Sequence, residues 1–143
     1  MNTEDVCKFL ANIPGIHLGG CLVSAYAFQQ YAKKIGEEVP VIVGLYHNDS
    51  SLSFRTNIEF IKNNGKGEAS SAYHFVWKYK KRRGLFDADG KYFDFVEKKI
   101  QIPLELSTLF YRTAMKCGPW NTVFNRSEIP RIEETLGVDL SYE

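Results

Sequence analysis

Two stretches near the start of the chain repeat apolar residues at the spacing of an α-helix. Residues 3–12 have a short apolar stripe followed by Pro14-Gly15, so we expect a short helix there. Residues 21–35 carry a much broader apolar pattern, with Gly36 as the expected stop, and this helix should lie at the centre of the core. Its main stripe consists of Cys21, Ala25, Phe28, Ala32 and Ile35.

Between residues 39 and 96 the pattern becomes that of β-strands. Residues 39–46 are rich in β-branched side chains and predict a buried strand. Residues 72–79 alternate with period two, so that an aromatic row shares one face and His74 lies on the other. The other predictions are a turn at 80–84, strands at 85–89 and 92–96 joined by a turn at Asp89-Gly90, helices at 54–63, 103–115 and 127–136, and a break at Gly118-Pro119.

Composition adds limits to this α+β pattern. A chain of 143 residues is expected to form one domain, residues 1–143, around one core. The formal net charge of +1 gives no reason to expect a nucleic-acid or membrane partner. The three cysteines are an odd number without metal-ligand spacing, which predicts a reducing compartment, no disulfide framework and no metal site.

The N-terminal residues predict no targeting segment. Residues 1–15 lack the basic start and apolar run of a signal peptide. No stretch approaches the roughly 20 apolar residues of a membrane helix. The expected location is therefore the cytoplasm, or the host cytoplasm if the gene is viral.

Cys21 is the leading candidate for chemistry. It follows Gly19-Gly20 and begins the most apolar predicted helix. A helix N-terminus and a nearby imidazolium both favour the thiolate, the nucleophilic form of cysteine. His74 could be that imidazole, and an aspartate could fix its tautomer and orientation. Backbone N–H groups of Gly20 and Cys21 are the candidate donors to an oxyanion.

The predicted hairpin brings His74 to one or two carboxylates. If Lys81-Arg82 form the turn, paired residue numbers sum to 163, so His74 lies opposite Asp89 and one diagonal step from Asp87. Both positions are within reach of a carboxylate–imidazole hydrogen bond. If the face of His74 packs on the helix that begins at Cys21, the three groups meet.

These residues carry a resemblance to a known family. Gly20-Cys21 followed by an alanine-rich helix, together with the segments 74–77 and 84–90, resembles the transglutaminase-like branch of the papain-like cysteine peptidase superfamily. The similarity covers roughly residues 15–93. It implies an α+β fold with a papain-like, transglutaminase-like core, in which the cysteine-bearing helix packs on a small antiparallel sheet. The apolar pattern of the last fifty residues, which the resemblance does not cover, adds a helical C-terminal part.

The resemblance also implies a reaction. Cys21, His74 and Asp87 would form the catalytic triad, with Asp89 as the alternative third member. The enzyme would be a hydrolase or acyltransferase (a peptidase, deamidase or transglutaminase-like enzyme) that acts on a protein or peptide through an acyl-enzyme intermediate and needs no cofactor or metal. No glutamine precedes Cys21 to donate to an oxyanion, and His17 is a candidate substitute.

Two other functions belong to different classes. The chain could be a catalytically inactive binding or inhibitor module on the same fold, encoded by a phage or bacterium. The basic run from Lys78 to Arg83, with Trp77 and Tyr79 beside it, could contact nucleic acid. We favour a solvated hairpin tip for this run, because the net charge of the whole chain is only +1.

Overall fold

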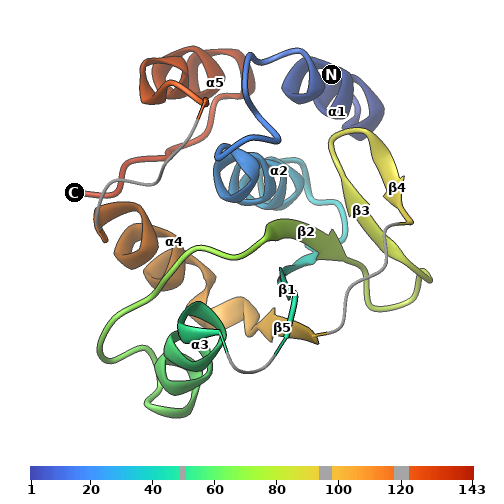
Figure 1. Ribbon diagram of the computed structural model, residues 1–143. Helices are drawn as coiled ribbons and strands as arrows, with labels where there is room; N and C mark the ends of the chain where they lie inside the picture. Colours follow the sequence, from blue (N-terminus) through green and yellow to red (C-terminus); the bar gives the residue numbers. More distant parts are fainter. Residues whose placement is uncertain (49–50, 94–97, 118–122) are drawn as a thin grey trace.

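The protein has an α+β fold, in which helices flank one five-stranded antiparallel sheet (Figure 1). The computed structural model describes residues 1–48, 51–93, 98–117 and 123–143. The helices are α1 (Thr3–Ala11), α2 (Cys21–Ile35), α3 (Leu52–Lys62), α4 (Ser107–Lys116) and α5 (Ile129–Leu136). The strands are β1 (Val41–Tyr46), β2 (His74–Lys78), β3 (Leu85–Asp87), β4 (Gly90–Tyr92) and β5 (Lys98–Ile102), and short 3-10 turns occupy Leu104–Leu106 and Arg126–Glu128.

The strands are ordered β4-β3-β2-β1-β5. Trp77 of β2 faces Phe86 of β3, so the predicted hairpin register, with paired numbers summing to 163, is confirmed. Asp87 pairs with Gly90, which makes Ala88-Asp89 the two-residue turn between β3 and β4. The turn is thus one residue earlier than predicted, and β3 ends at Asp87 instead of extending to Asp89.

Two further strands, β4 and β5, differ from what the sequence predicted. The third strand was expected at 92–96, whereas β4 ends at Tyr92 and residues 94–97 lie outside the described part of the chain. Strand β5 was not predicted. It alternates buried Ile100 and Ile102 with exposed residues, a pattern too short to stand out, and it gains its backbone partners from β1.

Helix α2 lies at the centre of the core, as its pattern predicted. It packs between α1 and α5 on one side and β1 and β2 on the other (Figure 1). The face of the sheet that it covers is the aromatic face, where Phe28 stacks on Trp77 with ring centroids 4.3 Å apart. The condition under which the three groups were expected to meet, that the face of His74 packs on this helix, is therefore not fulfilled, because α2 covers the opposite face. The aromatic face offers more apolar area to bury, which favours this packing.

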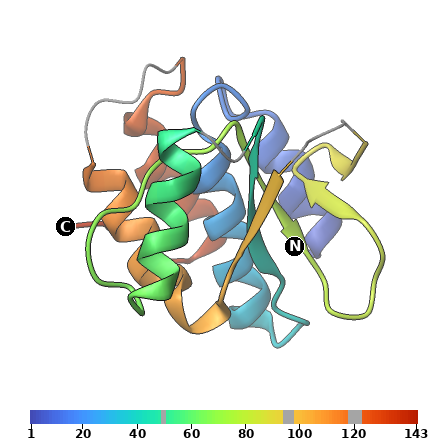
Figure 2. The same cartoon turned by 60° about the horizontal axis from the view of Figure 1, so that its bottom comes forward.

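The far face of the strands carries a smaller apolar cluster. Val43, Leu45 and Val76 are buried there, apart from the main core. Helices α3 and α4 lie together on one side of β1 and β5 (Figure 2), and they pack into the main core, where Phe110 of α4 contacts Phe75 of β2. Among the described residues, none of the helices combines the length and the apolar character needed to cross a membrane.

Candidate active site

Cys21 is the first residue of α2 and is 7% exposed. The preceding Gly20 has no room for a side chain, because a Cβ there would lie 2.7 Å from Cδ1 of the Phe124 ring. The segment that contains Phe124 also fixes the loop before α2, because the N–H groups of Val123 and Phe124 both donate to the Leu18 carbonyl (3.0 and 3.2 Å). Gly20 thus allows a close approach of the C-terminal part of the chain.

The start of α2 has backbone donors to offer. Within the part of the chain that the structure describes, no side chain caps this helix. The first helical hydrogen bond runs from the Ser24 N–H to the Gly20 carbonyl, so the N–H groups before Ser24 have no acceptor within the helix. Together with the helix dipole, they make the surroundings of Cys21 favourable for negative charge.

Two contacts join α2 to β2 at matching spacings along the two elements. The Phe28–Trp77 stack fixes one point of contact between the two elements. Cys21 lies seven helical residues before Phe28, about 10 Å along the axis. His74 lies three strand residues before Trp77, also about 10 Å. These equal spacings are matched by a second contact between α2 and β2, the hydrogen bond between Cys21 and His74 that contributes to the raised pKa of His74.

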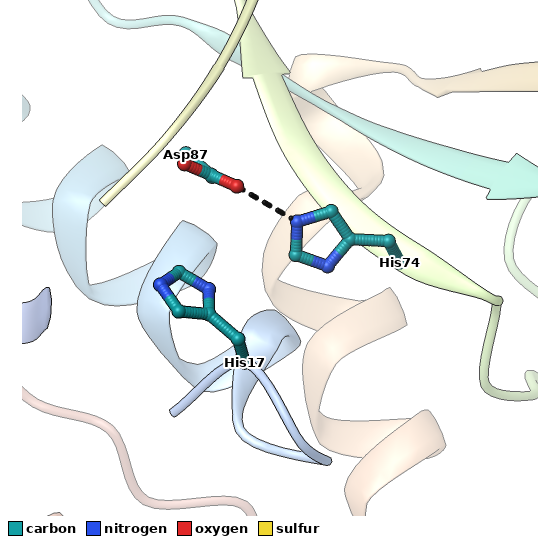
Figure 3. Close-up of side chains that lie close together, drawn as sticks. All are labelled: His17, His74 and Asp87. Atoms are coloured by element: carbon teal, nitrogen blue, oxygen red, sulfur yellow. Dashed lines mark hydrogen bonds and ion pairs between the residues drawn. The ribbon is translucent and has the colours of Figure 1, made fainter. Parts of the chain in front are cut away.

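His74 and Asp87 form a buried pair. Nε2 of His74 lies 3.0 Å from Oδ2 of Asp87, and the two side chains are only 9% and 11% exposed (Figure 3). Because a carboxylate can only accept, Nε2–H is the donor. Nδ1 is then the ring nitrogen that remains for Cys21. The second oxygen of Asp87 accepts from the Asp89 N–H at 2.9 Å, which holds the carboxylate in place.

Both members of this pair have shifted pKa values. Burial alone would lower the pKa of His74, but the hydrogen bonds with Asp87 and Cys21 and the negative charge of these groups raise it to about 9. Burial alone would raise the pKa of Asp87, yet the hydrogen bonds from His74 and the Asp89 N–H, with the positive charge of His74 and His17, lower it. The pair therefore favours an imidazolium beside a carboxylate.

Asp89, the alternative third member of the triad, lies elsewhere. Its Oδ2 is 3.0 Å from Nε2 of His17, and its side chain is 66% exposed. The approach is off the N–H direction, so Nε2 contacts the carboxylate without an aligned hydrogen bond. Of the two aspartates, Asp87 is the one that contacts His74.

A pocket of about 400 Å³ opens onto His74 and Asp87, and Cys21 is not one of its lining residues. It is lined by His17, Leu18, Tyr73, His74, Asp87, Asp89 and Tyr92. The ring of Tyr92 lies 5.0 Å from that of His74, between centroids. A larger pocket of about 670 Å³ lies beyond Asp87, between α1 and the β3–β4 hairpin, and neither Cys21 nor His74 lines it.

The sequence did not predict that His17 lies beside His74. Its ring centroid is 5.9 Å from that of His74, and one ligand atom from each of His17, His74 and Asp87 lies within 4.8 Å of the others (Figure 3). The only signal was its place four residues before Cys21. Tyr92 had no signal beyond its place in a predicted strand.

The other cysteines do not share these surroundings. Burial, together with the negative charges of Asp87 and Glu4, raises the pKa of the Cys7 thiol to about 11, so it stays protonated at neutral pH. Cys117 lies at the C-terminal end of α4, and residues 118–122 beyond it, which include the predicted Gly118-Pro119 break, are outside the described part of the chain.

Fold and site together define an α+β protein with a Cys-His-Asp cluster at a helix N-terminus. No protein-family model matches the chain, and no curated protein or solved structure matches it either.

Proposed function

We propose that the protein is a cysteine hydrolase or acyltransferase that acts on an amide, isopeptide or thioester bond of a protein or peptide. The observation that carries the proposal is the buried His74 ring, which holds Asp87 through Nε2 and interacts with Cys21. The order of the three residues and their resemblance to the transglutaminase-like branch of the papain-like superfamily support the same chemistry.

The reaction assigns one role to each group. The Cys21 thiolate attacks the substrate carbonyl, and a C–S bond forms while the carbonyl oxygen becomes an oxyanion. N–H groups at the start of α2 stabilise this charge. The imidazolium of His74 then gives its Nδ1 proton to the leaving amine or thiol as the bond to it breaks. Asp87 keeps the ring oriented and charged.

The second half of the reaction releases the acyl group. Water or an acceptor amine attacks the thioester carbon and loses a proton to His74. The C–S bond then breaks, and the thiolate of Cys21 is restored. Hydrolysis and transfer differ only in which acceptor enters.

The test is capture of the acyl-enzyme. Protein with Cys7→Ser and Cys117→Ser is mixed with p-nitrophenyl acetate, and the acetylated residue is located by mass spectrometry. We expect one acetyl group, on Cys21, and a slowing of about 10²-fold or more in His74→Ala. The exposed His47 supplies the matched control, because His47→Ala should acetylate at the parent rate.

Two results would contradict the proposal. Acetylation that is no slower in His74→Ala would remove the role of the imidazole. Acetylation that persists in Cys21→Ser would place the reactive group elsewhere. In either case a non-catalytic binding module becomes the better proposal for this fold.

A further inference from the structure

Three side chains from separate segments meet in a way that the proposed thiol chemistry does not require. His17 comes from the loop before α2, His74 from the start of β2 and Asp87 from the end of β3 (Figure 3). One ligand atom from each lies within 4.8 Å of the other two. A triad needs only one imidazole, so the second imidazole, His17, calls for a different explanation.

The donor set is one that binds transition metals. Two imidazoles and a carboxylate are common ligands of divalent zinc and of other first-row divalent ions. Zinc bonds of about 2.0–2.2 Å place tetrahedral ligand atoms roughly 3.3 Å apart. Reaching that spacing from the observed cluster needs a movement of about 1–2 Å, and the His17 side chain, in a loop and 29% exposed, has the freedom to make it.

Groups around the cluster are arranged to support such ligands. Asp89 lies 3.0 Å from Nε2 of His17, so the other ring nitrogen of His17 is left for a metal. The Asp89 N–H also donates to Oδ1 of Asp87, which leaves Oδ2 to bind. A carboxylate behind a ligating histidine is the usual outer-shell partner at metal sites. The pocket of about 400 Å³ that His17, His74 and Asp87 line gives an ion access.

We propose that His17, His74 and Asp87 bind a divalent transition-metal ion, with Zn²⁺ as the representative of that class. The ion replaces the proton on Nε2 of His74, and this proton is released to solvent. The hydrogen bond from Nε2 to Asp87 is then lost. His74 then cannot act as an acid and base for Cys21. The metal-bound and thiol-activating states therefore exclude one another, a consequence that rests on the proposed function.

The test begins with calorimetric titration of Zn²⁺ into the 143-residue protein carrying Cys7→Ser and Cys117→Ser, which removes the two other thiols. We expect one ion per chain. His17→Gln should weaken its binding at least about tenfold. His47→Gln is the matched control, since it removes the one histidine outside the cluster, and it should leave the affinity unchanged. Absence of binding at millimolar Zn²⁺, or equal affinity in His17→Gln, would overturn the metal site.

A second measurement separates this inference from the proposed function. Iodoacetamide labelling of Cys21 is followed with and without Zn²⁺ in the same protein. Labelling that slows on addition of Zn²⁺, and slows much less in His17→Gln, supports mutual exclusion. Unchanged labelling at saturating Zn²⁺ would overturn the exclusion. A Cys21 that is unreactive without Zn²⁺ would contradict the proposed function, while the titration would still decide the metal site.

Discussion

Asp87 and Asp89 are two residues apart, but they have different partners. Asp87 ends β3 and its buried carboxylate contacts His74, whereas Asp89 lies in the turn, is largely exposed and contacts His17. The sequence left this choice open, because either residue could reach His74 from a regular hairpin. The early end of β3 decides it, since Asp89 has left the strand.

Substitution by asparagine tests this difference. Asp87→Asn removes the charge that raises the pKa of His74, so labelling of Cys21 by iodoacetamide at pH 7 should slow about tenfold or more. Asp89→Asn is the matched control and should change the rate by less than about twofold, because its exposed charge is screened by solvent. Equal effects of the two substitutions would contradict the role given to Asp87.

The buried His74–Asp87 pair also predicts a pH dependence of stability. The pKa of His74 rises from 6.5 to about 9 on folding, so its contribution is complete below pH 6.5 and is lost as the pH rises through 9. The free energy of unfolding of the wild type, relative to His74→Gln, should fall by about 3 kcal/mol over this window. Denaturant titrations of both proteins from pH 5 to 10 provide the measurement.

At acid pH, the stability that Asp87 contributes changes with pH in the opposite direction. Because the pKa of Asp87 is lowered on folding, its contribution is present above the ordinary value of 3.8 and is lost as the pH falls through the folded value. The difference between wild type and His74→Gln should therefore be largest near pH 5–6. A difference that stays flat from pH 5 to 10 would show that the pair does not stabilise the fold.

At the scale of elements, the loop before α2 depends on a segment about 100 residues later. The ring of Phe124 occupies the space where a side chain at Gly20 would lie. Gly20→Ala should destabilise the protein by about 1–3 kcal/mol, because the close contact forces the loop or the ring to move. The cost should be smaller when Phe124→Ala is already present, although the Ile16 backbone, 2.9 Å from the Cβ position, prevents full relief. Unfolding of the four proteins of this cycle measures the coupling, and strict additivity would contradict the contact.

Much of the element pattern could be predicted from the sequence. The apolar stripe of residues 21–35 and the alternation of residues 72–79 each bury a face, so their periodicity is strong, and the register that pairs Trp77 with Phe86 followed from the turn. The choice of sheet face for α2 could not be predicted, since it depends on stacking of Phe28 on Trp77. Strand β5 was missed because five residues with two isoleucines give little signal.

In the candidate site, too, some residues could be predicted from the sequence and one could not. Cys21, His74 and Asp87 could be identified because each sits at a position with its own signal: a helix start, an alternating strand and a hairpin. His17 could not be assigned to the cluster, because its place depends on how the loop folds back and on contacts with Phe124, which is far from it in the sequence.

At the scale of the whole molecule, the charge balance predicts no general affinity for nucleic acid. The basic hairpin tip is partly used inside the protein, where the Arg82 guanidinium lies over the rings of Tyr79 and Phe86, 5.3 and 4.8 Å from their centroids. Titration of a fluorescent single-stranded oligonucleotide at low salt should show no saturable binding at micromolar protein. Tight binding that weakens steeply with added salt would contradict this prediction.

The central claim is that His74 activates the thiol of Cys21, and the rate of alkylation against pH tests it most directly. Iodoacetamide labelling is followed at each cysteine by peptide mass spectrometry from pH 5 to 10 in the wild type and in His74→Ala. We predict that Cys21 of the wild type labels faster at pH 6–7 than an unperturbed thiol and slows in His74→Ala. Cys7 should label only at high pH in both proteins, in line with its pKa of about 11. A Cys21 that labels no faster than an ordinary thiol at pH 6–7, or at the same rate without His74, would contradict the claim.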